Sequence, residues 1–184
     1  MGRRMRRLLL YGLIAALVAA PVLFVLRARP QLDDARDSVD TRWEALRAEL
    51  VDRYDTLDSA TGAASDAGLD DALIGELRAA LDDWSRSDDG GDAAVGVVTA
   101  NTLEGLGARL AAVRTGNARF EADEALAFTM AAYTENAPDP DLVSAYSDAV
   151  DHYESERSSA LKKPLSGVFG FKGRDDFEPS IRTT

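Results

Sequence analysis

A run of 19 residues without a charge, from Leu8 to Leu26, constrains this chain more than any other feature. Four arginines precede the run within residues 1–7, and Arg27 ends it. At about 1.5 Å per helical residue the run is roughly 28 Å long, close to the hydrocarbon thickness of a bilayer. Only a helix can cross that region with its backbone polar groups satisfied by its own segment. The run therefore predicts a transmembrane helix at residues 8–26 behind a basic cytoplasmic segment at residues 1–7.

A cleaved signal peptide is the alternative, and the basic start fits it. However, Pro21 follows Ala20 where cleavage would be expected, and the apolar run continues beyond it to Leu26. Signal peptides also have shorter apolar stretches. We therefore expect a retained anchor in the cell membrane. The positive-inside rule places the N-terminus in the cytoplasm and the residues from about 28 onward outside.

The chain beyond Arg27 is strongly acidic, with 32 acidic and 16 basic residues, and the whole chain has a net charge of −11. This balance argues against broad nucleic-acid binding, which needs a basic surface. Cysteine is absent, which excludes disulfides, thiol catalysis and thiolate metal sites, and a single histidine argues against a histidine-based metal site. We predict no cofactor, no metal and no nucleic-acid partner.

Aspartate outnumbers glutamate by 22 to 10, although aspartate is the poorer helix former. One hypothesis is adaptation to high salt, because short carboxylates hold water and salt screens their mutual repulsion. The alternative is a bias in genome composition that also favours acidic residues. Of the two, the salt hypothesis is preferred.

Apolar residues recur at every three or four positions beyond the span, which is the period of a helix, and no stretch alternates convincingly with the period of a strand. These stripes predict helices over residues 31–60, 69–84, 95–113, 126–133 and 140–161. Asp139, Pro140 and Asp141 are typical of a helix start, with a capping aspartate followed by proline at the first helical position. Pro30 predicts a bend between the span and the first of these helices.

Amphipathic helices need partners, because their apolar stripes must be buried. Long helices joined by short loops favour an up-down arrangement. We predict an all-α fold: an up-down antiparallel bundle of about four long helices, one of them interrupted, over residues 31–163. Prolines and glycines in residues 164–184 predict an irregular C-terminal tail that contains no helix.

The tail carries apolar and cationic side chains that an idle tail would not need. The candidate contact residues are Lys162, Lys163, Phe169, Phe171, Lys172, Arg174 and Phe177. One hypothesis is that they touch a membrane surface or a protein partner, with rings inserted and cations near phosphates. The alternative is that the phenylalanines close the end of the bundle, and the acidic residues nearby favour this alternative.

Several segments resemble the LemA family. They are the N-terminal span, SVDTRWEALRAELVDRYDTL at residues 38–57, Tyr146 and Tyr153 spaced seven residues apart, and LSGVFGFKGRDDFEP at residues 165–179. Gly-Phe-Lys followed five residues later by Phe-Glu is the most specific part. Tyr146-Ser147 and Tyr153-Glu154 stand where the family has Tyr-Asn pairs, so the chain resembles a divergent member. The resemblance implies a membrane-anchored four-helix bundle facing outward, and it implies no reaction.

Catalytic motifs are not evident in the sequence. His152 lacks a nucleophile at a motif spacing, and Asp88-Asp89-Gly90-Gly91-Asp92 lacks the spacing and the final glutamate of an EF-hand, so a solvated loop is preferred over a loose Ca²⁺ site. We therefore predict no catalytic residues and a non-enzymatic scaffold or accessory interaction factor of the cell envelope. It would bind an unknown protein partner or a second copy of itself. The alternatives are a small-ligand sensor and a hydrolase with a site between helices.

Overall fold

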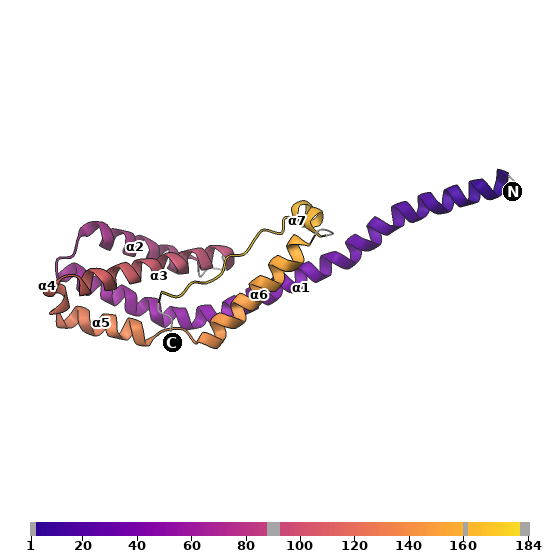
Figure 1. Ribbon diagram of the computed structural model, residues 1–184. Coiled ribbons are helices and arrows are strands. Elements are labelled where there is room, and N and C mark those ends of the chain that lie inside the picture. The colour runs from indigo at the N-terminus through magenta and orange to yellow at the C-terminus, as the bar shows by residue number, and fades with distance from the viewer. Residues whose placement is uncertain (1–2, 88–92, 160–161, 181–184) are drawn as a thin grey trace. The chain divides into compact units, whose positions relative to one another are not determined.

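The structure, a computed structural model, describes residues 3–87, 93–159 and 162–180, and for residues 3–26, 164, 165 and 168 it describes the backbone alone. The described residues form helices and no strand, which confirms the predicted all-α fold. The helices are α1 (Arg3–Asp66), α2 (Asp71–Arg86), α3 (Ala93–Thr115), α4 (Ala118–Glu121), α5 (Glu124–Glu135), α6 (Pro140–Ser158) and α7 (Lys163–Phe169) (Figure 1).

The chain divides into two compact units. Unit 1 holds residues 1–38 and 152–173, which contribute the first part of α1, the end of α6 and α7. Unit 2 holds residues 39–151 and 174–184, which contribute the rest of α1, helices α2 to α5 and the first part of α6. Most of the described buried side chains lie in unit 2.

Helix α1 runs without interruption from Arg3 to Asp66 and passes through Pro30. The prediction that a helix begins near residue 31 is therefore wrong. Pro30 removes one backbone hydrogen bond, and the helix continues on both sides of it. The apolar stripe predicted after Pro30 is buried, as expected. Its members are Leu32, Ala35, Val39, Trp43, Leu46, Leu50, Tyr54 and Leu57.

The predicted membrane span at residues 8–26 belongs to the backbone of α1, and its side chains lie outside the described residues. Where side chains are described, none of the helices combines the length and the apolar character needed to cross a bilayer. The span at residues 8–26 thus stays a prediction.

Aspartates cap the first turns of α2 and α6, and the second of these caps, at Asp139, was predicted. The Asp70 carboxylate accepts a hydrogen bond from the backbone N–H of Ala72 at 3.2 Å. The Asp139 carboxylate accepts one from the backbone N–H of Asp141 at 2.8 Å, directly before the helix that starts at Pro140. Such bonds satisfy donors that the first turn of a helix leaves free. The four-residue α4, capped by Asn117, was not predicted.

The stripe predicted over residues 95–113 is correct only in part. Leu106 and Leu110 are buried, whereas Val95 and Val98 are 57% and 51% exposed. The buried face of α3 also includes small residues that the prediction left out, Gly96, Ala100 and Gly107. A Cβ atom on Gly96 would lie 3.0 Å from the Trp43 indole, and one on Gly107 would lie 2.5 Å from the Tyr133 hydroxyl oxygen. Because glycine has no side chain, the Trp43 and Tyr133 rings can approach the α3 backbone at these two positions. Residue size therefore helps to decide which face of this helix is buried.

Aromatic rings fill the space between the helices of unit 2. The rings of Tyr54 on α1 and Trp84 on α2 pack edge to face with centroids 4.8 Å apart. Trp43, also on α1, packs against Trp84 at 6.3 Å and against Tyr146 of α6 at 5.6 Å. Helices α2 and α3 also contact each other directly, and Figure 1 shows them side by side. Edge-to-face pairs of this kind add to the stability that burial provides.

The irregular tail was predicted for residues 164–184, and this prediction is wrong for residues 164–169, which belong to α7. Pro164 lies in the first turn, where a missing N–H costs no hydrogen bond, and Gly170 ends the helix in the left-handed conformation at φ +73°. The residue types that were expected to break a helix therefore begin and end one. From Phe171 to Pro179 the chain forms neither helix nor strand.

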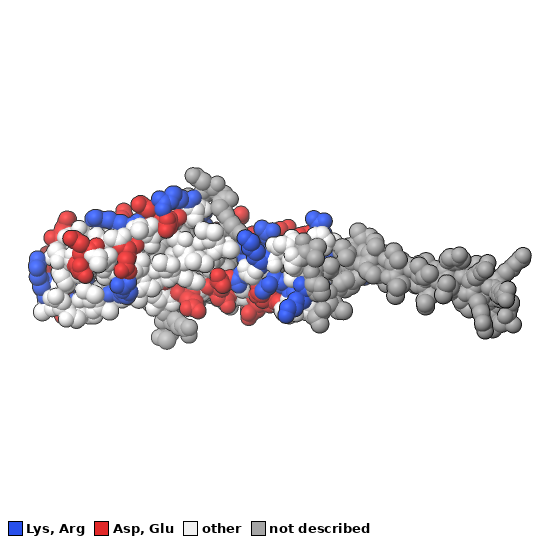
Figure 2. Space-filling view, turned by 90° about the horizontal axis from the view of Figure 1, so that it is seen from above, with Lys and Arg blue, Asp and Glu red and all other residues white. Residues whose placement is uncertain are grey.

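Most aspartates and glutamates among the described residues are exposed, and Figure 2 shows them spread over the visible face with basic groups between them. If these carboxylates repel one another, raising NaCl from 0.05 to 2 M stabilises the fold by screening that repulsion. We expect the melting temperature to rise by about 2–4 °C for each kcal/mol of repulsion removed. A thermal melt of the full chain followed by circular dichroism measures this rise, and an unchanged melting temperature contradicts the salt hypothesis.

Candidate functional site

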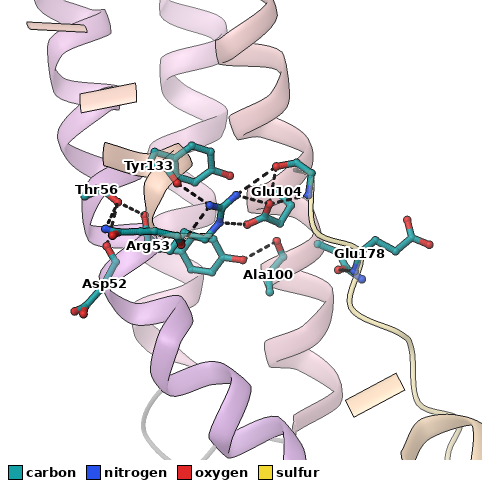
Figure 3. Close-up of polar contacts among 11 residues, drawn as sticks. Asp52, Arg53, Thr56, Ala100, Glu104, Tyr133 and Glu178 are labelled. Carbon is teal, nitrogen blue, oxygen red and sulfur yellow. Dashed lines mark hydrogen bonds and ion pairs between the residues drawn. The ribbon is translucent and has the colours of Figure 1, made fainter. Parts of the chain in front are cut away.

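A fully buried arginine stands at the centre of unit 2. Arg53 of α1 is 0% exposed, and its Nε and Nη2 atoms donate to the two carboxylate oxygens of Glu104 on α3 at 2.7 and 2.9 Å (Figure 3). Its Nη1 atom donates to the carbonyl oxygen of Tyr133 at 2.6 Å and to that of Asn136 at 3.4 Å, at the end of α5. Arg53 thus satisfies carbonyls that the last turn of α5 leaves free and joins three helices.

Glu104 connects this arginine to the C-terminal tail. The carboxylate oxygen Oε2 of Glu104 accepts hydrogen bonds from the backbone N–H of Ser180 at 2.9 Å and from its hydroxyl at 2.6 Å. Figure 3 shows the tail passing beside α3 at this point. With the two bonds from Arg53, the carboxylate accepts four hydrogen bonds, which is close to its full capacity.

The electrostatics of the pair keep both partners charged. Burial alone would raise the pKa of Glu104, but hydrogen bonds and charge from Arg53 and hydrogen bonds from Ser180 outweigh it, so the pKa lies below its ordinary value. Burial alone would lower the pKa of Arg53, and the hydrogen bonds and charge of Glu104 raise it overall. Burial raises the pKa of the nearby Tyr133 phenol to about 12, with the charge of Glu104 adding to the effect.

This geometry does not suit acid or base catalysis by Glu104. A general base needs a free oxygen and a pKa near the working pH. Glu104 is 1% exposed, accepts four hydrogen bonds and has a lowered pKa. The arrangement instead holds α1, α3, α5 and the tail together.

Two groups of the predicted contact residues can be distinguished by unit. Lys162, Lys163, Phe169, Phe171 and Lys172 belong to unit 1, whereas Arg174 and Phe177 belong to unit 2.

In unit 1, the ammonium group of Lys162 pairs with Glu156, and Lys163 and Lys172 are exposed. Phe169 is 40% exposed, with the Arg29 guanidinium 5.2 Å from its ring centroid. Contact of these residues with lipid or a partner stays a prediction.

Phe171, Arg174 and Phe177 are buried against the chain itself. In unit 2 the Arg174 guanidinium donates to the Asp40 carboxylate at 2.9 Å. The alternative hypothesis, that the phenylalanines close the end of the bundle, requires buried rings. Phe171 and Phe177 meet this requirement and Phe169 does not, so the closing role stays a prediction.

His152 lines an open cavity of about 410 Å³ in unit 1 together with Asp34, Ser38 and Glu156. The histidine is exposed, as expected from its place beside the apolar stripe. Asp88, Asp89 and Asp92, which formed the weak Ca²⁺ candidate, lie outside the described residues.

Sequence analysis missed Arg53, Glu104 and Ser180. A signal was present for the first two, because Arg53 follows Leu50 by three residues on the apolar stripe of α1, and Glu104 follows the buried Ala100 by four. A charged residue at a core position indicates a buried ion pair. Nothing in the local sequence marks Ser180.

Comparisons of the chain with protein-family models, with curated proteins and with solved structures find no match. The LemA resemblance therefore depends on the sequence segments quoted above.

Proposed function

We propose that this chain is a single-pass membrane protein of the LemA type that acts as a non-catalytic scaffold or accessory interaction factor of the cell envelope. The observation that carries the proposal is the uncharged run Leu8–Leu26 between arginines. The backbone is helical from Arg3 to Asp66, so a helix crossing the bilayer would continue directly into the outer residues. Its N-terminus would face the cytoplasm.

We also propose that the helices of residues 31–163 form an up-down antiparallel bundle. The direct contacts of α2 with α3, and the link that Arg53 makes from α1 to α3 and α5, support this arrangement. Such a bundle leaves long exposed helical faces on which partners can dock.

Cell fractionation tests the membrane anchor. The full chain should sediment with membranes, remain there in high salt and be released by detergent, because about 19 apolar residues partition into lipid. Replacing Leu13 and Val18 by arginine should move it to the supernatant, since each arginine near the centre of a span costs about 2.5–3.5 kcal/mol. As a matched control, arginines at Ala45 and Ala48, which are exposed on α1, should leave the chain in the membrane fraction.

Two outcomes would contradict the anchor. One is a wild-type chain that stays in solution after high-speed centrifugation. The other is a mature chain whose first residue lies beyond Leu26. If the anchor holds, crosslinking in native membranes tests the scaffold role, and we expect the same protein partners to be recovered across growth conditions; their absence would contradict that role.

The alternatives differ in their support. The hydrolase alternative lacks support from Glu104, whose oxygens are already occupied. The small-ligand sensor has one observation in its favour, the open cavity whose lining includes Asp34, Ser38, His152 and Glu156. A ligand-observed NMR screen of small polar molecules against the full chain would test it.

A further inference from the structure

The segment Arg174–Ser180, called here the tail segment, is held by side chains of unit 2 in the way that an extended peptide is held by a receptor. The Asn101 side chain of α3 donates through Nδ2 to the carbonyl oxygen of Asp176 at 2.8 Å and accepts through Oδ1 from the backbone N–H of Glu178 at 2.8 Å. The Tyr146 hydroxyl of α6 donates to the carbonyl oxygen of Asp175 at 2.8 Å. These contacts bind main-chain groups, which supplies affinity without reading side chains.

Three anchor residues supply the selectivity. The Arg174 side chain is 4% exposed and pairs with Asp40 of α1 at 2.9 Å, Phe177 is 3% exposed, and Ser180 donates twice to Glu104. The anchors are spaced three residues apart. The residues between them that carry acidic side chains, Asp175, Asp176 and Glu178, are exposed. The segment thus presents one anchor in every three residues to unit 2, and the acidic side chains between the anchors face solvent.

Glu104, one of the groups that bind the tail segment, is also held by a residue outside it. Glu104 would lose the two bonds from Ser180 but keep both bonds from Arg53, which also binds the end of α5. When the groups of a binding site are already ordered, binding a ligand costs little free energy for ordering them.

We propose that the face formed by Asp40, Asn101, Glu104 and Tyr146, called the tail-binding face, is a peptide-recognition site whose occupant here is the chain's own tail segment. Its ligand class is an extended segment with Arg, Phe and Ser spaced three residues apart, and its partner is the tail segment of a second copy. This inference goes beyond the scaffold role and does not depend on the membrane anchor, because it stands on contacts within unit 2.

The second copy is the partner because its tail carries every anchor that the face binds. The chain's own tail competes with it at an effective concentration on the millimolar scale. Exchange between copies therefore depends on protein concentration, and exchange of identical segments is a low-cost route to a dimer. The tail thus acts as an internal inhibitor of self-association.

A fluorescent peptide of residues 171–184 tests the site directly. The receptor is the full chain in detergent micelles carrying Arg174→Ala and Phe177→Ala, which weaken its own tail. We expect the peptide to bind this variant at least about tenfold more tightly than the wild-type chain, where the own tail competes. A peptide with Phe177→Ala should bind about tenfold more weakly, and one with the exposed Glu178→Gln should bind equally well. A helical receptor that does not distinguish the Phe177→Ala peptide from the wild type overturns the proposal.

Hydrogen exchange on the unmodified full chain covers the case in which the variant loses its helices. The backbone amides of Glu178 and Ser180 should exchange about tenfold or more faster than the core amides of α3, because the tail opens without unfolding the helices. Equal protection would mean that the tail opens only when the whole unit unfolds, and this overturns a peptide-recognition site.

Mixing experiments test the second copy. Full chains labelled with donor or acceptor dyes should show energy transfer that grows with protein concentration and falls when excess 171–184 peptide is added or when Asn101→Ala removes the main-chain contacts. Energy transfer that is absent at every concentration, or that is insensitive to both the peptide and Asn101→Ala, overturns tail exchange between copies.

Discussion

Replacing Arg53 by methionine should destabilise the protein by about 3–5 kcal/mol, the largest loss expected for a single side chain here. The reason is the carboxylate that remains. Glu104 is 1% exposed, and without Arg53 it would keep its charge in the protein interior with only the bonds from Ser180. Urea unfolding of the full chain in detergent, followed by circular dichroism, measures the loss. Arg42→Met, at an exposed position of the same helix, is the matched control and should change stability by about 0.5 kcal/mol or less.

The contribution of Glu104 to stability should depend on pH with opposite signs in the wild type and in Arg53→Met. In the wild type the pKa of Glu104 is lowered on folding, so its contribution is fully present above the pKa of the unfolded state, near 4.5, and is lost as the pH falls through the folded value. In Arg53→Met, burial without the arginine charge raises the pKa of Glu104, so protonation at acid pH relieves the penalty of the buried carboxylate. The stability difference between the two proteins should therefore shrink from pH 7 to pH 4. A difference that is independent of pH contradicts a charged Glu104.

A double variant distinguishes the effect of the unpaired Glu104 charge from the effect of losing the packing of the Arg53 side chain. Arg53→Met combined with Glu104→Met removes both charges of this buried pair, and well-packed apolar replacements of buried ion pairs are often neutral or stabilising. We expect it to regain most of the stability that Arg53→Met loses. If the double variant is as unstable as the single one, the loss comes from packing of the Arg53 side chain rather than from Glu104.

The buried stripe of α1 could be predicted because its apolar residues recur at the helical period, which places them on one face of the helix. Leu46, Leu50 and Leu57 repeat at the helical period, and all are 0% exposed. Arg53 occupies the same stripe, yet a pattern of apolar residues cannot include a charge whose partner lies 51 residues away on α3. The candidate site was therefore missed because ion pairing between distant helices leaves only a local anomaly in the sequence.

Part of the buried face of α3 was mispredicted, for a different reason. Hydropathy favours Val95 and Val98 over Gly96 and Ala100, although the structure buries the small residues. A small residue is buried when a large ring occupies the space beside it, and that ring belongs to another helix. Trp43 packs next to Gly96, and the Tyr54 hydroxyl donates to the carbonyl oxygen of Ala100 at 3.2 Å. Sequence periodicity has no information about such a partner.

The tail shows a limit of the same kind. Its Phe177 and Arg174 were recognised as too distinctive for an idle tail, and both are buried. What they bind could not be predicted, because Asp40 precedes Arg174 by 134 residues and the backbone contacts of Asn101 depend on the conformation of the tail. Local sequence identifies anchors, whereas tertiary packing decides their partners.

Gly107→Ala should destabilise the protein by about 1–3 kcal/mol, although alanine is the better helix former by about 1 kcal/mol. The added Cβ atom would lie 2.5 Å from the hydroxyl oxygen of Tyr133 and 2.8 Å from the ring carbon that bears it, so α3 or the ring must move. Gly105→Ala is the matched control, since it lies two residues away on the same helix, is exposed and has nothing within 4 Å of its Cβ position. It should stabilise the protein by about 0.5–1 kcal/mol. Thermal melts of the two variants should shift in opposite directions.

Tyr133→Phe gives this prediction a second test. The Tyr133 hydroxyl is buried and has no hydrogen-bond partner among the described atoms, so its removal alone should cost little. In a double variant with Gly107→Ala, Tyr133→Phe removes the contact between the new Cβ atom and the hydroxyl oxygen but leaves the contact with the ring carbon. It should therefore restore part of the lost stability. The two substitutions should therefore be non-additive, as expected for residues in contact. Additive effects, or a Gly107→Ala variant that gains stability as Gly105→Ala does, would mean that the close packing of Tyr133 on α3 does not determine how this helix faces the rest of unit 2.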